Sequence, residues 1–203
     1  TLNSHPWLLP CLNGTLDLRT GDLRPHAHDD YLTRCLTTAY LPDAQAPAWA
    51  AFLWRVMGGS VGGEPSPDET TAGVIENRQQ GDTQAPQLVT FLQRAVGYAL
   101  VGDMREECLF LLHGTGRNGK SKFLSTLQTL LGPYAKTADM RSFLLQDRET
   151  VRNDLADLFG TRLVCAIELQ DGRRLAEGLV KQLTGQDRIK ARFLFKEYFE
   201  FSP

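Results

Sequence analysis

Hydrophobic and polar residues alternate near the start of the chain. Between residues 8 and 41 the apolar pieces are short, and Leu16 and Leu18 alternate with polar residues. This alternation lies between two turn signals, Asn13-Gly14 and Thr20-Gly21-Asp22. A short alternating run between such turns is typical of a β-hairpin, so we predict one here.

Farther along, the apolar residues take the spacing of a helix. In APAWAAFLWRVMGG they fall at i, i+3, i+4 and i+7, and Gly58-Gly59 follows. The spacing resumes at Leu88, Phe91, Leu92, Ala95 and Ala99. A further helix is predicted from Lys120 to Leu131, closed by Gly132-Pro133.

The stretch from Gly59 to Gln87 differs from both neighbours. It is rich in Gly, Pro, Ser, Thr and Gln, and its charged residues are mostly acidic. Such a composition has little apolar surface to offset the entropy of ordering, so we predict a flexible, solvated insertion. An acidic interaction segment is the alternative.

Two apolar runs read as buried strands, Cys108–His113 and Leu163–Ile167. Since helical patterns surround them, they predict an α/β layer with a mainly parallel sheet.

Composition narrows the class of protein. The 203 residues carry a net charge of -2 and are 42% hydrophobic and 23% charged, as in a globular protein without a general affinity for nucleic acid. The four cysteines have no CxxC pair and are expected to be buried thiols in a reducing cytoplasm. No apolar run approaches the ~18 residues of a membrane span, so no membrane partner is expected. The start at Thr1 suggests a segment of something longer.

The turn GTGRNGKS fits the spacing GxxxxGK(S/T) of a phosphate-binding loop. Its glycines let backbone N–H groups point at phosphate oxygens, and the following helix adds the positive end of its dipole. Lys120 is expected to reach the β- and γ-phosphates of ATP, and the Ser121 hydroxyl to ligate Mg²⁺. The predicted nucleotide-binding residues are Gly114, Thr115, Gly116, Arg117, Asn118, Gly119, Lys120, Ser121 and Lys122. The alternative is a glycine-rich turn with a surface lysine.

An acid follows the second apolar run directly. Glu168 at that strand end could orient or deprotonate the attacking water and help to hold Mg²⁺. We predict Lys120 and Glu168 as catalytic residues and Ser121 and Glu168 as Mg²⁺ ligands, with Asp171 as the reserve acid. Otherwise Glu168 is a solvated charge at a strand end.

The segment GQDRIKARFLFKEYFEFSP, residues 185–203, has strand alternation. One predicted face is apolar, with Ile189, Ala191, Phe193 and Phe195. The other face is cationic, and we expect it to contact DNA phosphates through Arg188, Lys190, Arg192 and Lys196. The alternative is the solvated side of an amphipathic strand.

In this order, the segments resemble the helicase part of phage and plasmid replicative primase-helicases, within helicase superfamily III. The resemblance rests on Asn118 before the second glycine, on RLVCAIE, and on LVKQLTGQDRIKARFLFKE. Upstream, NGTLDLRTGDLRPH and FLQRAVGYALVGD resemble the helical domain that precedes the helicase core in poxvirus and phage members.

The resemblance implies a P-loop NTPase of AAA+-like, superfamily III type at 108–203, preceded by a mainly α-helical domain at 1–107. It implies an ATP-dependent DNA helicase that works with Mg²⁺ on single-stranded DNA or a replication fork. It further implies a homo-oligomeric, hexameric ring and a cytoplasmic protein that is bacterial or phage-encoded. The sensor residue and the arginine supplied by a neighbouring subunit are expected beyond residue 203, and no primase activity is assigned.

Two other functions stay open at the level of sequence. A P-loop kinase would need a lid with arginines and an acceptor pocket. A non-catalytic replication module would keep the fold without turnover.

Overall fold

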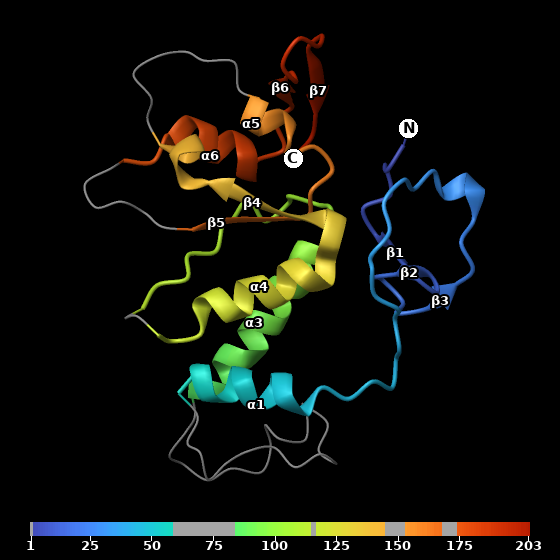
Figure 1. Cartoon of the computed structure of the whole chain (residues 1–203), viewed down its shortest axis with the longest axis vertical. Coiled ribbons are helices and arrows are strands. Elements are labelled where there is room, and N and C mark those ends of the chain that lie inside the picture. The colour runs from blue at the N-terminus through green and yellow to red at the C-terminus, as the bar shows by residue number, and fades with distance from the viewer. Residues whose placement is uncertain (1, 59–83, 115–116, 145–152, 168–173) are drawn as a thin grey trace. The chain divides into compact units, whose positions relative to one another are not determined.

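The computed structural model describes the chain except for residues 1, 59–83, 115–116, 145–152 and 168–173. The described residues form a mixed α/β structure with three small sheets (Figure 1). They divide into two compact units, one of residues 1–40, 99–112 and 121–203 and one of residues 41–98 and 113–120. The predicted boundary between residues 107 and 108 stays a prediction.

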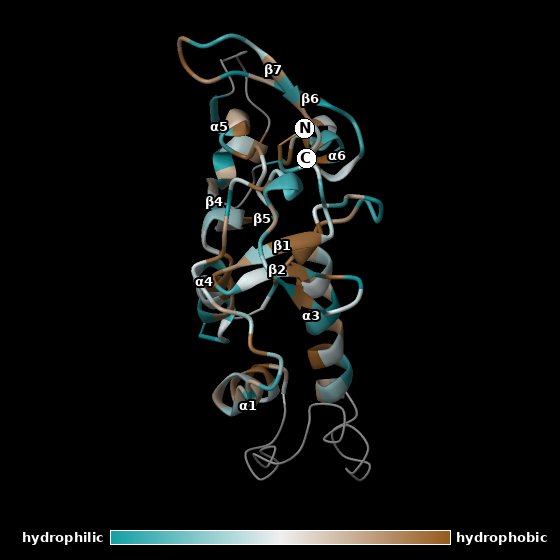
Figure 2. Ribbon diagram, turned by 90° about the vertical axis from the view of Figure 1, so that its right-hand side faces the viewer, coloured by the Kyte–Doolittle hydropathy of each residue, from teal (hydrophilic) through white to brown (hydrophobic). Residues whose placement is uncertain are grey.

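The first sheet confirms the predicted hairpin and has one strand more, three in all. Strands β1 (Leu8–Cys11), β2 (Gly14–Asp17) and β3 (Leu23–Arg24) pair antiparallel in that order. The two turn signals lie at its two reversals. Figure 2 shows β1 in the brown of apolar residues, and all four of its residues are buried.

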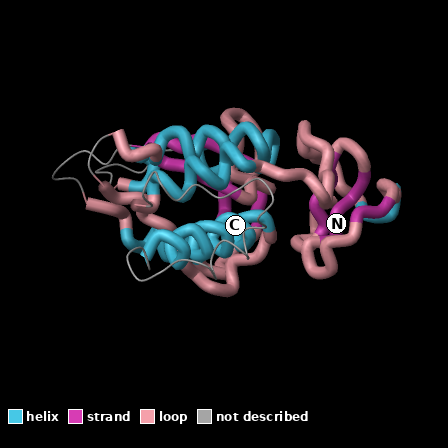
Figure 3. The backbone as a smooth tube through the Cα atoms, turned by 90° about the horizontal axis from the view of Figure 1, so that it is seen from below, coloured by secondary structure: helices cyan, strands magenta, loops and turns pink. Residues whose placement is uncertain are grey.

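The expectation of a mainly α-helical N-terminal domain is wrong for its first part. Up to Ala46 the described residues form strands, loops and one 3-10 turn, His28–Asp30. Figure 3 shows this magenta and pink part around the N-terminus. Turn-forming Gly, Asn and Pro recur every few residues up to Pro25, which favours short strands over a helix there.

Two helices of the second unit follow. Helix α1 (Pro47–Val56) confirms its prediction, with Pro47 at its first turn and the rings of Trp49 and Phe52 stacked at 5.3 Å. Helix α3 (Gln84–Leu100) begins before Gln87, so the predicted insertion is too long at that end. Residues 59–83 of the insertion lie outside the described residues.

The buried stripe of α3 is shifted from the predicted one. Ala85, Val89 and Leu92 are buried, whereas Leu88 and Phe91 are largely exposed. The predicted spacing was compatible with either stripe, and packing against neighbouring residues selects between them.

Helix α4 (Lys120–Leu131) agrees with its prediction at both ends. Its buried residues are Phe123, Leu127 and Leu131, one face of the helix. Gly132 ends it with φ +48 and begins a 3-10 turn, Gly132–Tyr134.

The second sheet is parallel, but its composition differs from the prediction. Strand β5 (Leu163–Ile167) forms where predicted and pairs with β4 (Ala135–Asp139) from Ala135↔Leu163 to Asp139↔Ile167. It is not the buried strand that was predicted, since Cys165 is buried but Val164 is 39% exposed. The predicted strand 108–113 has no regular secondary structure, and Leu111 is 70% exposed. An apolar run becomes a strand only where a neighbour completes its backbone hydrogen bonds, and within the described residues none pairs with it.

One core joins the first sheet to the end of α4. Its buried residues are Leu9, Cys11, Leu16, Leu36, Leu131 and Tyr134. The half-buried Arg162 crosses this region, donating hydrogen bonds to the carbonyls of Leu8 (2.7 Å) and Leu100 (2.5 Å). Its guanidinium carbon lies 4.8 Å from the ring centroid of Tyr134, and burial lowers the pKa of Arg162.

The cysteines are free, as expected, but only two of them are buried. Cys11 and Cys165 are buried, and burial raises the pKa of each thiol. Cys35 is exposed.

The C-terminal part contains a second hairpin, which packs on short helices. After α5 (Asn153–Ala156) and α6 (Glu177–Thr184), strands β6 (Ile189–Ala191) and β7 (Phe199–Phe201) pair antiparallel (Figure 1). The register is Ile189↔Phe201, Lys190↔Glu200 and Ala191↔Phe199. The buried core under the hairpin consists of Leu155, Ala156, Ile189, Ala191 and Phe201.

Candidate functional site

The described residues of the predicted phosphate-binding motif, 114 and 117–121, lie at the start of α4 (Lys120–Leu131) and in the turn before it. Gly114 has φ +154 and Gly119 has φ +84, and Arg117 is also left-handed at φ +63. A Cβ on Gly114 would lie 2.2 Å from Asn118 Nδ2, and one on Gly119 would lie 2.6 Å from Val56 Cγ1 of α1. Both backbone conformations therefore favour glycine, and at Gly119 the β-branched Val56 also leaves no space for a side chain.

Lys120 links two residues of this loop by hydrogen bonds. Its Nζ donates hydrogen bonds to the Gly114 carbonyl at 2.9 Å and to Asn118 Oδ1 at 2.7 Å. The side chain of the half-buried Lys120 is thus bonded to the loop that precedes it. A fixed positive charge beside a helix start is chemistry that binds anions such as phosphate.

Ser121 and Lys122 belong to the first turn of α4, and both are exposed. That turn contains no acidic residue, so no side chain of its own neutralises the positive end of this 12-residue helix. The Ser121 hydroxyl is a hard oxygen donor at the place where a phosphate-bound cation would need one.

Part of the predicted site lies outside the described residues. Thr115 and Gly116 of the loop and the acids Glu168 and Asp171 belong to this part. β5 ends at Ile167, the residue before Glu168. The roles predicted for these four residues stay predictions.

The close approach of the loop to α1 gives a stability prediction. We expect Gly119→Ala to lower the free energy of unfolding by about 1–3 kcal/mol, because the new methyl group meets Val56 and the backbone is left-handed. Gly178→Ala is the control, since that glycine lies in α6 with no neighbour within 4 Å and should gain ~0.5–1 kcal/mol. Urea denaturation of the two variants measures both changes. Equal stability of Gly119→Ala and the parent would show that the loop does not pack on α1 as described.

The predicted cationic residues lie on the C-terminal hairpin, but Lys190 alone among them belongs to a strand, β6. Arg188 and Lys190 are exposed, and Arg192 is half-buried just after β6. Arg188 lies 3.7 Å from the Glu200 carboxylate across the hairpin, so its charge is partly compensated. Lys196 is exposed in the loop that joins the strands.

The predicted apolar face is correct for two residues and wrong for two. Ile189 and Ala191 are 1% and 2% exposed, whereas Phe193 is 42% and Phe195 98% exposed. Strand pairing ends at Ala191, and the chain then turns, so the two-residue period does not extend to Phe195.

Tyr198 is a residue of this surface that the sequence reasoning missed. Lys190 Nζ lies 5.1 Å and Arg192 Cζ 4.6 Å from its ring centroid. These cation–π contacts place two cations beside one aromatic ring. The alternation in YFEF, after a charged turn, was the available signal for a second strand.

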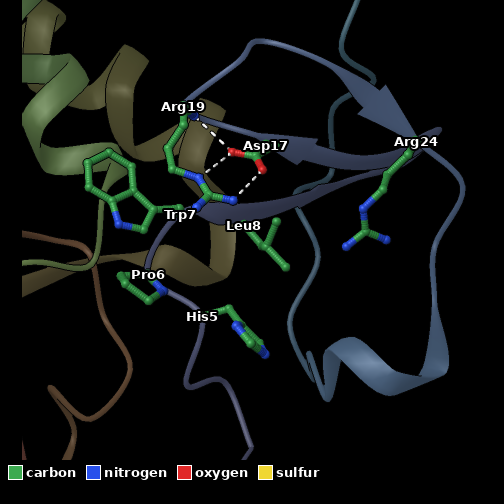
Figure 4. A pocket seen from close by; sticks show the side chains of 7 residues that line it. All are labelled: His5, Pro6, Trp7, Leu8, Asp17, Arg19 and Arg24. Carbon is green, nitrogen blue, oxygen red and sulfur yellow. Dashed lines mark hydrogen bonds and ion pairs between the residues drawn. The ribbon is translucent and has the colours of Figure 1, made fainter.

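A surface hollow of about 400 Å³ lies beside the first sheet (Figure 4). Its polar lining includes Arg19, which bonds Asp17 at 2.8 Å, and Arg24, which bonds Asp30 at 2.6 Å. The Arg19 side chain, with its backbone N–H, lowers the pKa of Asp17 to about 2. Because both arginines already have carboxylate partners, this hollow offers an incoming anion little uncompensated charge.

Comparison with known proteins adds two findings. Residues 1–58 match the family model described as "D5 N terminal like". The chain is also 27% identical over 205 aligned residues to a protein of Acanthamoeba polyphaga mimivirus named "Putative helicase". The alignment covers all of this chain and 19% of the viral protein, so the chain spans about a fifth of that relative's length.

Both similarities support the primase-helicase resemblance at a coarse level. Among the residues that the structure describes, no helix is both long and apolar enough to cross a lipid bilayer.

Proposed function

We propose that this chain is part of an ATP-driven DNA helicase of replication, with a P-loop NTPase core of superfamily III type. The observation that carries the proposal is the loop Gly114–Ser121, in which two glycines shape the backbone and Lys120 is held inside the turn. Similarity to a viral protein named as a helicase supports the choice among nucleotide-binding functions.

In this proposal the loop binds the phosphates of ATP through its backbone N–H groups. Lys120 exchanges its bonds to Gly114 and Asn118 for bonds to the β- and γ-phosphates. The exchange is favourable for the ammonium group, because hydrogen bonds to charged acceptors replace hydrogen bonds to neutral ones. The positive end of α4 adds to the attraction.

Ser121 and Glu168 would hold Mg²⁺, and the described donor, an exposed hydroxyl at the helix start, fits that ion. When bound, Mg²⁺ supplies positive charge that stabilises the transferring phosphoryl group. Glu168 orients the attacking water or accepts its proton.

The hairpin β6–β7 is proposed to contact DNA. Lys190, Arg192 and Lys196 provide cations on or beside one face, while Ile189 and Phe201 anchor the opposite face in the core. Because the hairpin is anchored in the core, a movement driven by ATP hydrolysis at the loop would also move a DNA strand bound to these cations. The proposed assembly is a homo-oligomeric ring on single-stranded DNA or a fork, in the cytoplasm.

The proposal is tested by ATPase assays on the full-length protein with and without single-stranded DNA. We expect release of free phosphate that rises when DNA is added. Transfer of the γ-phosphate to an acceptor molecule would instead identify a kinase, and turnover that DNA leaves unchanged would contradict the helicase.

The salt dependence of DNA binding tests the cationic face. Each phosphate contact to a single strand contributes about -0.7 to the slope of log affinity against log salt concentration. We expect Lys190→Gln with Lys196→Gln to flatten this slope by roughly 1–1.5 units, alike for unrelated sequences. Fluorescence anisotropy of a labelled oligonucleotide across a salt series measures it.

Arg188→Gln is the matched control for that measurement. Its charge already faces Glu200, so its removal should change the slope by clearly less than one contact. If the double variant shows the same salt slope and the same unwinding as the parent, the hairpin has no role in DNA binding.

A further inference from the structure

Phe195 is an aromatic side chain with 98% of its surface exposed, in the loop between β6 and β7. Its φ of +60 lies in the left-handed region, which is unfavourable for a bulky residue. An exposed apolar ring in an unfavourable conformation has no explanation in the packing of the chain, and such outliers gather at functional positions.

The loop that carries Phe195 is held on both sides. Phe193 stacks on Phe199 with centroids 5.7 Å apart and planes at 22°, and Phe199 stacks in turn on Phe201 of the buried core. The Leu194 N–H donates to Asn153 Oδ1 at 3.1 Å, and the Lys196 N–H donates to the Phe193 carbonyl at 3.0 Å. These contacts fix the turn, and the turn leaves the ring of Phe195 in solvent.

The charges near the ring of Phe195 indicate which kind of partner it contacts. Lys196 is its neighbour in the chain, and Lys190 and Arg192 lie beside Tyr198 at the base of the same loop. A partner that suits both features must offer a flat, apolar face and negative charge within a few ångströms of each other. Unpaired nucleotides do so, because each base has a free π-face and each linkage a phosphate.

We propose that Phe195 stacks on an unpaired base of a single strand whose phosphates are held by Lys190, Arg192 and Lys196. This inference rests on the proposed function and deepens it, since it assigns the strand's bases, as well as its phosphates, a contact on the hairpin. A base within a duplex is already stacked on both sides, so the contact selects single strands. It is blind to sequence, because every base has a π-face.

The test compares two ligands and four variants of the full-length protein. The ligands are a single-stranded oligonucleotide of mixed sequence and an abasic one of equal length, which keeps the phosphates and lacks the bases. We expect Phe195→Ala to weaken binding of the normal strand about 5- to 150-fold, the equivalent of ~1–3 kcal/mol for one stacked base. Binding of the abasic strand should stay unchanged.

Two further variants separate stacking from general apolar contact. Phe195→Trp keeps a π-face and should bind the normal strand as the parent does, whereas Phe195→Leu should lose affinity as the alanine variant does. Leu194→Ala is the matched control, because that side chain is exposed in the same loop and is not aromatic. A 2-aminopurine base in the strand should lose fluorescence on binding to the parent and keep it with Phe195→Ala.

Each other outcome overturns the inference. Unchanged affinity in Phe195→Ala, or full affinity in Phe195→Leu, would exclude base stacking. A changed oligomeric state of Phe195→Ala in sedimentation, at unchanged affinity for DNA, would assign the ring to contact with another copy of the chain.

The failure of this inference differs from that of the proposed function. If Phe195 is without effect while Lys190→Gln with Lys196→Gln still flattens the salt slope, only the stacking is excluded. If the parent protein binds no single strand at any salt concentration, the proposed function fails as well.

Discussion

Lys120→Ala should reduce the affinity of the full-length protein for ATP by roughly 100- to 10,000-fold. Each charge-assisted hydrogen bond contributes about 1.5–3 kcal/mol, and the ammonium group is proposed to make two, to the β- and γ-phosphates. The substitution also removes the hydrogen bonds that the Gly114 carbonyl and Asn118 Oδ1 accept from Lys120 in the parent protein. Isothermal titration with a slowly hydrolysed ATP analogue measures the loss.

Two controls accompany this variant. Arg105→Ala removes an equal charge from a surface pair with Asp103, outside the loop, and should leave ATP affinity unchanged. The stability of Lys120→Ala should be measured beside its affinity, because the lysine also cross-links the loop. A folded Lys120→Ala variant that binds ATP like the parent would refute the assignment of the loop as a nucleotide site.

Arg162→Ala should lower the free energy of unfolding by about 3–5 kcal/mol. The guanidinium bonds the carbonyls of Leu8 and Leu100, which lie in distant parts of the sequence, and it packs on the ring of Tyr134. Hydrogen bonds from a charged donor contribute ~1.5–3 kcal/mol each, and the cation–π contact adds ~0.5–2 kcal/mol. Part of this sum is offset, because the variant no longer has to bury a charge.

Arg162→Lys distinguishes shape from charge. A single ammonium cannot reproduce the planar fork that meets two carbonyls, so the lysine variant should recover only part of the stability. Arg174→Ala, at an exposed arginine, should change stability by less than ~0.5 kcal/mol. Urea denaturation followed by circular dichroism measures all three variants. A loss below about 1 kcal/mol for Arg162→Ala would refute the stabilising role of its bonds to Leu8 and Leu100.

The elements that sequence reasoning located best are those whose ends are local signals. Helix α4 begins at the glycine-rich turn and stops at Gly132-Pro133, and both signals act within a few residues. The first sheet depends on equally local signals, since its two turns contain the steps Asn13-Gly14 and Gly21-Asp22.

The elements that were missed depend on partners distant in the chain. Strand β4 has the sequence AKTAD, which has no strand pattern of its own and forms by pairing with β5. The run 108–113 has the stronger strand composition, yet within the described residues it has no strand neighbour. Strand propensity describes fit to a sheet, and the choice of neighbours is made by the whole fold.

The candidate site shows the same division. The spacing of the loop identified Lys120 and its glycines, because the motif is contiguous. The exposure of Phe195 and the pairing of Tyr198 with two cations depend on where β6 stops, which is set by its register with β7. The alternating pattern alone could not reveal that end.

The contact between Gly119 and α1 can form only after both segments have been synthesised. Phe52 and Val56 of α1 lie against the glycine that precedes Lys120, yet they are synthesised more than 60 residues earlier. Helix α1 therefore leaves the ribosome before the loop that it contacts. Until the loop is translated, the helix lacks this contact. The turn that contains Gly119 therefore gains its contact with α1 only after both segments have been translated, and the proposed ATP site is complete no earlier than that.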